Sequence, residues 1–212
     1  MSERLWLSRL KLNARHRDAA GALRDAQSLH ALTMRCLPSG VTRAQASLLH
    51  HANLRSGTLL VQSAVEPQWP TTPAFRAQTK EITPFIESVV DGERLRFTLR
   101  AVPMRRQSAT LSNGRLMKEP GEHALRTDPE RIAWLERLIQ PTARLVYRPM
   151  ISVEAERVGH RNGRRFAHRP VLFDGVLQVE DAQTLHTLVA KGVGRAKSYG
   201  NGLLMLARLP DA

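Results

Sequence analysis

The sequence has little cysteine, no long apolar run and no signal-like start, and each absence excludes a class of protein. Cys36 is the one cysteine, so the chain can form neither an internal disulfide nor a cysteine-based zinc site. No apolar run approaches the ~20 residues that a membrane-spanning helix needs. The first residues do not read as a secretory signal. We therefore expect a soluble, cytoplasmic protein without a membrane partner.

Aromatic and acidic residues are also scarce. Aromatics make up 5% of the chain, and no aromatic pair lies on an expected strand in the RNP pattern, so stacking on single-stranded bases is poorly supported. The 19 acidic residues face 32 basic ones, which gives a formal net charge of +13 and indicates a polyanionic partner. Five of the basic residues are lysines, and the rest are arginines, whose planar guanidinium groups suit bidentate phosphate contacts.

The first half of the chain shows recognisable elements with gaps between them. Alternation predicts a strand over residues 6–12. Asp25 is a good N-cap for a helix that carries Leu29, Leu32 and Cys36 on one apolar stripe. A strand is expected over 58–63 and a proline-rich loop over 66–73, while 41–57 fits no pattern and 75–90 suggests a strand or two.

The second half is clearer. Leu95, Phe97 and Leu99 alternate with arginines, which predicts a half-buried strand with a basic outer face. The remaining expected elements are a basic loop over 103–127, a helix with Asp128 as N-cap that ends before Pro141, strands within 145–156 and 166–179 joined by a turn at Asn162-Gly163, a helix after Asp181 and a strand over 203–209.

This order, β-α-β-β-α-β, is that of a ferredoxin-like unit, and the first half fits a degraded copy of it. The expected fold class is therefore α+β, with two tandem ferredoxin-like (RRM-like) domains over residues 1–91 and 92–212. The segment Asp91-Gly92-Glu93 marks the boundary between them.

The expected turn at Asn162-Gly163 carries the strongest local charge of the chain. Residues 157–169, here called the arginine hairpin, contain no acidic residue and two histidines. A solvated loop is the simpler interpretation, but arginines on a two-stranded ribbon can follow the phosphates of a duplex. The candidate RNA-binding residues in this segment are Arg157, Arg161, Arg164, Arg165 and Arg169.

A glycine-rich segment lies between the last helix and the last strand. Residues 192–202, here called the glycine loop, hold four glycines, two cations and a serine. Such a loop can simply end a helix and turn into a strand, or its exposed N–H groups can hold phosphates. Its candidate RNA-binding residues are Gly192, Gly194, Arg195, Lys197 and Ser198.

The glycine loop and the two leucines after it, Gly-Val-Gly-Arg-Ala-Lys-Ser-Tyr-Gly-Asn-Gly-Leu-Leu, carry a family resemblance. They resemble the C-terminal G-hydrophobic-G-x-A-K-S-x-G-x-G-L-L motif of the CasE CRISPR repeat RNA endoribonucleases, members of the RAMP superfamily found in type I-E Cascade. Further segments follow the family's order over nearly the whole chain: Leu5-Trp6-Leu7-Ser8-Arg9-Leu10, Leu60-Val61-Gln62-Ser63, Leu95-Arg96-Phe97-Thr98-Leu99-Arg100-Ala101, Ile132-Ala133-Trp134-Leu135 and Val171-Leu172-Phe173-Asp174-Gly175.

The resemblance implies which residues carry the chemistry. His30 matches the histidine of the family's Tyr-x-x-His element, and it also falls away from the apolar stripe of its helix. Gln27 stands where the family has tyrosine, and an amide can hydrogen-bond but cannot act as a phenolic acid or base. Arg35 lies where some relatives carry lysine and is a candidate for charge stabilisation, although it lies on a different helical face from His30.

We therefore expect a metal-independent endoribonuclease without a cofactor. It would bind a CRISPR repeat RNA hairpin, cut precursor CRISPR RNA by attack of a ribose 2′-OH, leave a 2′,3′-cyclic phosphate and a 5′-OH, and keep the product as a Cascade subunit beside the other subunits. His30 would transfer one proton, as general base or acid.

Other interpretations stay open. A non-catalytic basic RNA-binding protein or chaperone would use the same glycine loop and arginine hairpin. A DNA-binding regulator is a third class, but no helix-turn-helix pattern supports it. Metal catalysis could use His50 and His51, yet adjacent histidines in a strand or helix point apart, and no nuclease-type carboxylate cluster is present.

Overall fold

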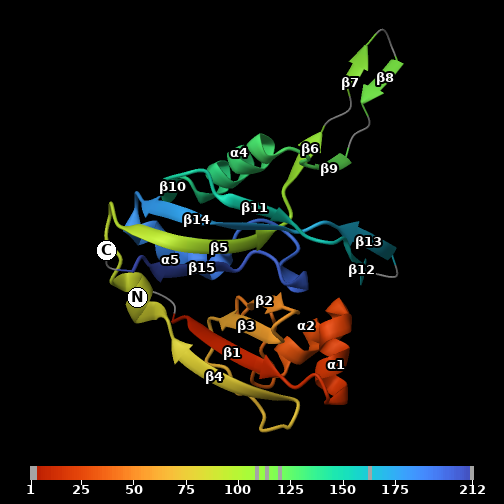
Figure 1. The fold of residues 1–212 in the computed structure, drawn as a ribbon, viewed down its shortest axis with the longest axis vertical. Coiled ribbons are helices and arrows are strands. Elements are labelled where there is room, and N and C mark those ends of the chain that lie inside the picture. The colour runs from red at the N-terminus through yellow and green to blue at the C-terminus, as the bar shows by residue number, and fades with distance from the viewer. Residues whose placement is uncertain (1–3, 108–109, 113–114, 119–120, 162–163, 211–212) are drawn as a thin grey trace.

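The protein is built on two antiparallel sheets, each with its own hydrophobic core (Figure 1). A computed structural model describes the backbone of residues 4–107, 110–112, 115–118, 121–161 and 164–210, and the side chains of these residues except those in 107–118, 157–166 and 168. In the described residues, no helix is long and apolar enough to span a membrane.

The first sheet has the strand order β2-β3-β1-β4, made by β1 (Trp6–Leu12), β2 (Leu49–Asn53), β3 (Thr58–Ser63) and β4 (Phe75–Glu81). Helices α1 (Arg17–Arg24) and α2 (Ala26–Met34) cover one side of it. The Asp25 carboxylate accepts a hydrogen bond from Ser28 N at 2.7 Å, as expected of an N-cap. Leu29, Leu32 and Cys36 are buried, which confirms the predicted stripe.

Three elements of this half were not predicted. Helix α1 has no counterpart among the predicted elements, because its buried residues are the small Ala19 and Ala22, which mark an apolar face only weakly in the sequence. Strand β2 lies in the segment without a clear pattern. Helix α3 (Thr83–Glu87) follows the predicted strand within 75–90 and is a single short turn around Pro84.

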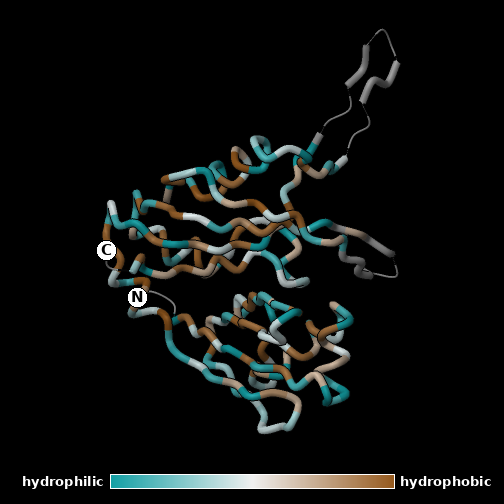
Figure 2. Tube along the Cα trace, viewed as in Figure 1, coloured by the Kyte–Doolittle hydropathy of each residue, from teal (hydrophilic) through white to brown (hydrophobic). Residues whose placement is uncertain are grey.

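The second sheet has β5 (Arg94–Ala101) at its centre, between β14 (Val171–Val179) and β15 (Leu204–Arg208). Two short strands, β10 (Ala143–Leu145) and β11 (Met150–Val153), pair with the outer edge of β14. Apolar residues recur along these strands (Figure 2), and many of them are buried in one core. The predicted strands at 95–101 and 203–209 are confirmed. The strand predicted over 166–179 is divided, because residues 171–179 form β14 and the residues before 169 belong to a separate ribbon.

Helices α4 (Asp128–Ile139) and α5 (Ala182–Lys191) pack on this sheet. Asp181 caps α5 as predicted, by accepting hydrogen bonds from Gln183 N and Thr184 N. The N-cap of α4 is Thr127 rather than Asp128, because Thr127 and Glu130 form a reciprocal capping box that leaves Asp128 in the first turn.

The segment 103–127, predicted as a basic loop, is instead a long pair of ribbons. Strand β6 (Met104–Gln107) pairs with β9 (Gly121–Ala124), and β7 (Thr110–Ser112) pairs with β8 (Arg115–Lys118) beyond them. The ribbon projects away from both sheets (Figure 1), and its short strands carry no apolar alternation that would predict them.

The arginine hairpin forms the predicted ribbon. Strand β12 (Arg157–Arg161) pairs in register with β13 (Arg164–His168). The turn predicted at Asn162-Gly163 lies outside the described residues, as do the side chains of the four arginines within these two strands.

Polar contacts join the two halves of the chain. Arg100, expected on an open basic face of β5, is 5% exposed, since the first sheet covers it. Its Nη1 donates to Ala52 O at 2.8 Å, and its Nη2 lies 2.8 Å from Glu154 Oε1. Gln62 Nε2 donates to Val189 O at 2.9 Å in the same interface. The outer-face prediction is therefore wrong at Arg100, which fastens the halves together.

Candidate functional site

The three features singled out in the sequence meet around helix α2. The short helix η1 (Lys197–Tyr199) of the glycine loop lies against both α2 and β2, and strand β12 of the arginine hairpin also lies against α2. These segments are more than 120 residues apart in sequence from α2 and belong to the other half of the chain. The fold therefore places the His30 helix, the glycine loop and the arginine hairpin at one location.

His30 lies at this junction with its imidazole partly buried. Its Nδ1 is buried and has no hydrogen-bond partner. Burial, and secondly the positive charge of Arg43, lower the pKa of His30 below its ordinary value. The neutral ring, which can accept a proton, is therefore the dominant form at neutral pH.

Basic side chains gather at this junction, and we call His30, Arg43, His50 and Lys197 the His30 cluster. Burial lowers the pKa of Lys197, and Arg43 and Lys191 lower it further. Burial lowers the pKa of His50 to about 3, with smaller contributions from His30 and Arg43. No carboxylate of the described residues contributes to these shifts, so the positive charge is not compensated.

Arg43 is the member that connects the others. Its Nε and Nη2 atoms are buried without a hydrogen-bond partner, although a guanidinium group normally satisfies its donors when it is buried. Unsatisfied buried donors of a permanent cation favour an anion as the missing partner. The His30 cluster is thus suited to hold a phosphate beside a neutral imidazole.

The glycine loop is held in place by its backbone. Val193 N donates to Gly202 O at 2.8 Å, and Gly202 N donates to Arg100 O at 2.7 Å. A Cβ at Gly192 would lie 2.6 Å from Gly202 O and 2.7 Å from Leu49 Cδ1. A Cβ at Gly200 would lie 3.3 Å from the His50 ring. Glycines therefore allow the loop to pack directly on β2.

The structure gives the other predicted loop residues distinct positions. Lys197 is partly buried and donates from Nζ to Lys191 O at 2.6 Å, which leaves it further donors. Arg195 is exposed and forms an ion pair with Glu122. Gly194 packs on the Trp134 ring, since a Cβ at this position would lie 3.0 Å from Trp134 Cη2. Ser198 is partly exposed. Contact of these residues with RNA stays a prediction.

Three further predicted residues lie toward solvent. Gln27 is exposed on the first turn of α2. Arg35 is exposed at the end of α2, and its Nη1 lies 3.0 Å from Asp18 Oδ2 of α1. Arg35 is not among the charges that shift the pKa of His30, whereas Arg43 is. Arg169, whose side chain the structure describes, is exposed beyond the hairpin.

Sequence analysis missed three residues of this site. Arg43 lies in a segment without periodicity, so nothing indicated that its side chain would turn toward His30. His50 was considered only as a metal ligand, but it lies buried beneath Gly200. Tyr199, one of two tyrosines, is carried by η1 to α2. A basic residue between two buried segments was the only available signal for Arg43.

The described residues contain no group of three or more histidine, cysteine, aspartate or glutamate side chains that could hold a metal ion. His50 and His51 follow one another on β2 and are both buried.

Comparisons with known proteins agree on one family. The family described as "CRISPR associated protein" matches residues 5–208. The chain is 31% identical over 219 residues to CRISPR-associated endoribonuclease Cse3 of Thermus thermophilus, covering 96% of this chain and 100% of the relative. It is 33% identical over 194 residues to the CRISPR system Cascade subunit CasE of Escherichia coli, covering 88% of this chain and 94% of the relative.

Solved structures give the same result. The fold matches Thermus thermophilus Cse3 bound to an RNA that represents a pre-cleavage complex, with a TM-score of 0.79, 29% identity and coverage of 96% of this chain and 99% of the other. It also matches Cas6e of Escherichia coli, with a TM-score of 0.73, 28% identity and coverage of 96% and 100%.

Proposed function

The chain belongs to the family of CRISPR associated proteins that includes Cse3 and CasE, and from this premise we propose that it is an endoribonuclease that binds and cuts CRISPR repeat RNA. The observation that carries the proposal is the meeting of the His30 helix, the glycine loop and the arginine hairpin at one place. Since relatives of similar length are named as an endoribonuclease and as a Cascade subunit, we propose that this chain also assembles with the other Cascade subunits.

In the proposed reaction, His30 takes the proton from the ribose 2′-OH beside the scissile phosphate. The 2′-oxygen then forms a bond to phosphorus as the bond to the 5′-oxygen breaks, which leaves a 2′,3′-cyclic phosphate and a 5′-OH. Arg43 and Lys197 stabilise the charge that develops on the phosphoryl oxygens. The lowered pKa of Lys197 makes it a stronger acid than a free lysine, so it is a better proton donor to the leaving oxygen than Gln27.

The proposal includes the domain organisation of the protein and its location in the cell. The strand order of the first sheet and the β-α-β-β-α-β order of the second support two tandem ferredoxin-like domains, with a boundary near residues 91–93. The first of them lacks a helix between β3 and β4. We also propose that the protein acts in the cytoplasm, where precursor RNA is made.

Product analysis of a labelled repeat hairpin tests the reaction. In excess EDTA, we expect full cleavage with a 2′,3′-cyclic phosphate on one product and a 5′-OH on the other. A matched hairpin with a 2′-deoxy nucleotide at the cleavage position should bind with nearly the same affinity and stay uncut. Cleavage of the deoxy hairpin, or 5′-phosphate products, would reject attack by the 2′-OH.

Replacing Arg43 with methionine should move the acidic limb of the pH profile. The base must be unprotonated, so kcat/KM falls as the pH falls through the pKa of His30 in the free enzyme. Removal of the Arg43 charge raises this pKa toward its ordinary value, and activity should be lost at a higher pH than in the unmodified protein. The value that kcat/KM reaches above this pKa should also fall by roughly 10²–10³-fold if Arg43 stabilises the transition state.

The comparison variant for this experiment is Arg35→Met, which removes the same charge from the end of α2. Because Arg35 does not shift the pKa of His30, its acidic limb should coincide with that of the unmodified protein. An unmoved limb in the Arg43 variant would contradict the assignment of His30 as base.

A non-catalytic RNA-binding protein is the alternative, because the arginine hairpin and the glycine loop would serve binding equally well. A neutral, partly buried histidine beside an uncompensated arginine is the observation that favours the enzyme.

A further inference from the structure

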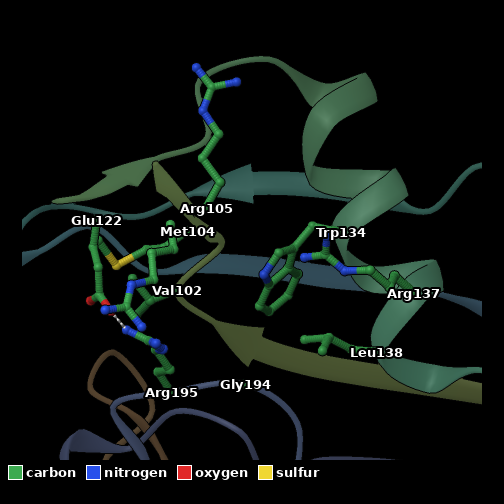
Figure 3. Close-up of a pocket in the computed structure, with 10 residues that line it drawn as sticks. Val102, Met104, Arg105, Glu122, Trp134, Arg137, Leu138, Gly194 and Arg195 are labelled. Atoms are coloured by element: carbon green, nitrogen blue, oxygen red, sulfur yellow. Dashed lines mark hydrogen bonds and ion pairs between the residues drawn. The ribbon is translucent and has the colours of Figure 1, made fainter. Parts of the chain in front are cut away.

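The first residues of the glycine loop line a second basic pocket, which shares no residue with the His30 cluster. It has a volume of about 540 Å³, within the roughly 300–1,000 Å³ of small-ligand sites. We call it the Trp134 pocket (Figure 3). Its walls come from β6, β9, α4 and the glycine loop, and its charged residues are Arg105, Arg106, Arg137, Arg195 and Glu122.

Two of the four arginines are free to bind a ligand. Arg195 contacts Glu122, and Arg105 Nη1 lies 3.4 Å from Glu130 Oε1. Arg106 and Arg137 form no ion pair with the described part of the chain, and both are exposed. The four positive charges meet one negative charge on the pocket wall, so the site favours an anion.

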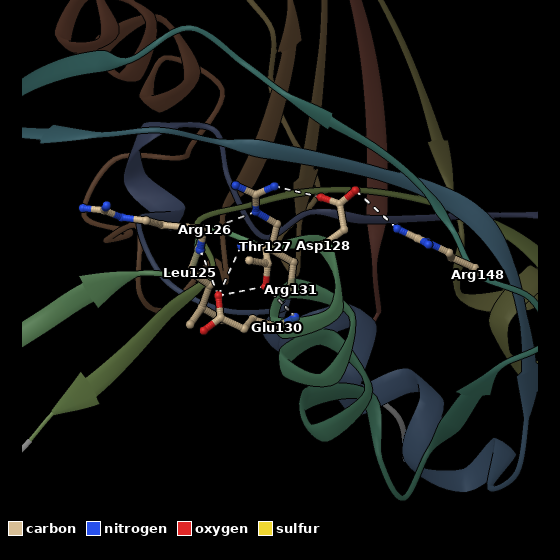
Figure 4. A network of polar contacts seen from close by, with 7 residues as sticks. All are labelled: Leu125, Arg126, Thr127, Asp128, Glu130, Arg131 and Arg148. Carbon is tan, nitrogen blue, oxygen red and sulfur yellow. Dashed lines mark hydrogen bonds and ion pairs between the residues drawn. The ribbon is translucent and has the colours of Figure 1, made fainter.

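The floor of the pocket is apolar and rigid. Trp134 is 6% exposed and stacks on Phe173, with ring centroids 6.4 Å apart. Figure 3 shows Arg137 beside the indole and the Arg195–Glu122 contact across from it. The start of α4 is fixed by the capping network of Thr127 and Glu130 (Figure 4), so the helix holds Trp134 and Arg137 in place before a ligand arrives.

The position of this pocket connects it to the cleavage site. Arg195 lines the pocket, and Lys197 of the His30 cluster follows two residues later, so their Cα atoms are at most about 7 Å apart. An RNA strand with a phosphate at Lys197 can therefore extend along the loop and reach the pocket with a neighbouring nucleotide.

We infer that the Trp134 pocket binds a nucleotide of the same RNA that lies outside the stem, with its phosphate on Arg106 and Arg137 and its base toward the apolar floor. This inference rests on the proposed function. Unpaired arginine forks match phosphate geometry, and the apolar floor suits a base released from the stem. The pocket would extend recognition from the stem to the flank beside the cut.

The test compares two RNAs on the full-length protein: the stem-loop trimmed at the cut, and the same stem-loop with single-stranded flanks. For the double variant Arg106→Ala/Arg137→Ala, we expect Kd for the flanked RNA to rise about tenfold while Kd for the trimmed RNA stays the same. The slope of log K against log salt should become shallower by about 1–2 for the flanked RNA alone, which corresponds to one or two lost phosphate contacts.

A matched control is Arg76→Ala/Arg94→Ala, which removes two exposed arginines on β4 and at the start of β5. It should leave the ratio of the two Kd values as it is in the unmodified protein. An unchanged ratio in the pocket variant would overturn the inference, as would equal weakening of both RNAs. Failure of the unmodified protein to bind either RNA would instead refute the proposed function.

Discussion

His30→Ala is expected to reduce the single-turnover rate of repeat RNA cleavage by about 10²–10⁴, the range that a positioned general base contributes. The structure gives the physical reason, because the imidazole is kept neutral by burial and by Arg43 at the point where the glycine loop and the arginine hairpin meet. Kd for the repeat hairpin should change by less than about threefold, since the phosphate contacts come from other residues.

The matched control for this prediction is His186→Ala, which removes a partly buried histidine from α5. It should retain the cleavage rate. Loss of binding together with cleavage in the His30 variant would assign a structural role to His30. Full cleavage by the His30 variant would leave only the RNA-binding alternative.

Gly192→Ala is expected to give the largest loss of stability among the glycine substitutions and to abolish cleavage. Gly192 has φ +67° and ψ 167°, a region that is essentially restricted to glycine, and its new Cβ would collide with Gly202 O and Leu49. The free energy of unfolding should fall by more than about 3 kcal/mol. Because the collision separates the loop from β2, Lys197 would leave the His30 cluster, and the remaining folded protein would be inactive.

Gly40→Ala provides the control, because Gly40 has φ +82° and open space around its Cβ position. Its positive φ costs an alanine about 1–2 kcal/mol, without a collision. Denaturant unfolding measures the loss of stability in each variant, and we expect the larger loss for Gly192→Ala, which adds the collision. Equal losses of stability would mean that close packing of the loop contributes nothing.

The helices and strands that could be predicted from the sequence are those marked by a local pattern of apolar residues. Strand β5 and helix α2 were found because burial imposes a clear period on their apolar residues. Helix α1 was missed because its buried residues are the two alanines Ala19 and Ala22, which mark an apolar face only weakly. The strands of the ribbon from β6 to β9 are three or four residues long, too short to show a period. Arg100 was misplaced for a related reason, since alternation shows that a residue faces away from one core but not that a second sheet covers it.

The residues of the candidate site also differ in whether a local sequence signal marks them. The glycine loop and His30 could be located from a motif, which is local in sequence. Arg43 could not, since its role depends on how the segment before β2 packs against α2. The collision expected at Gly192 likewise involves Leu49, more than 140 residues earlier in the chain. Only the folded protein brings such pairs together.

The order of synthesis has a consequence for the proposed enzyme. The helix that bears His30 is synthesised more than 150 residues before the glycine loop. A nascent or truncated polypeptide that stops before residue 192 contains the histidine but lacks Lys197 and the segment that packs on β2. If the proposed site is right, translation products that stop before residue 192 are therefore unable to cut RNA.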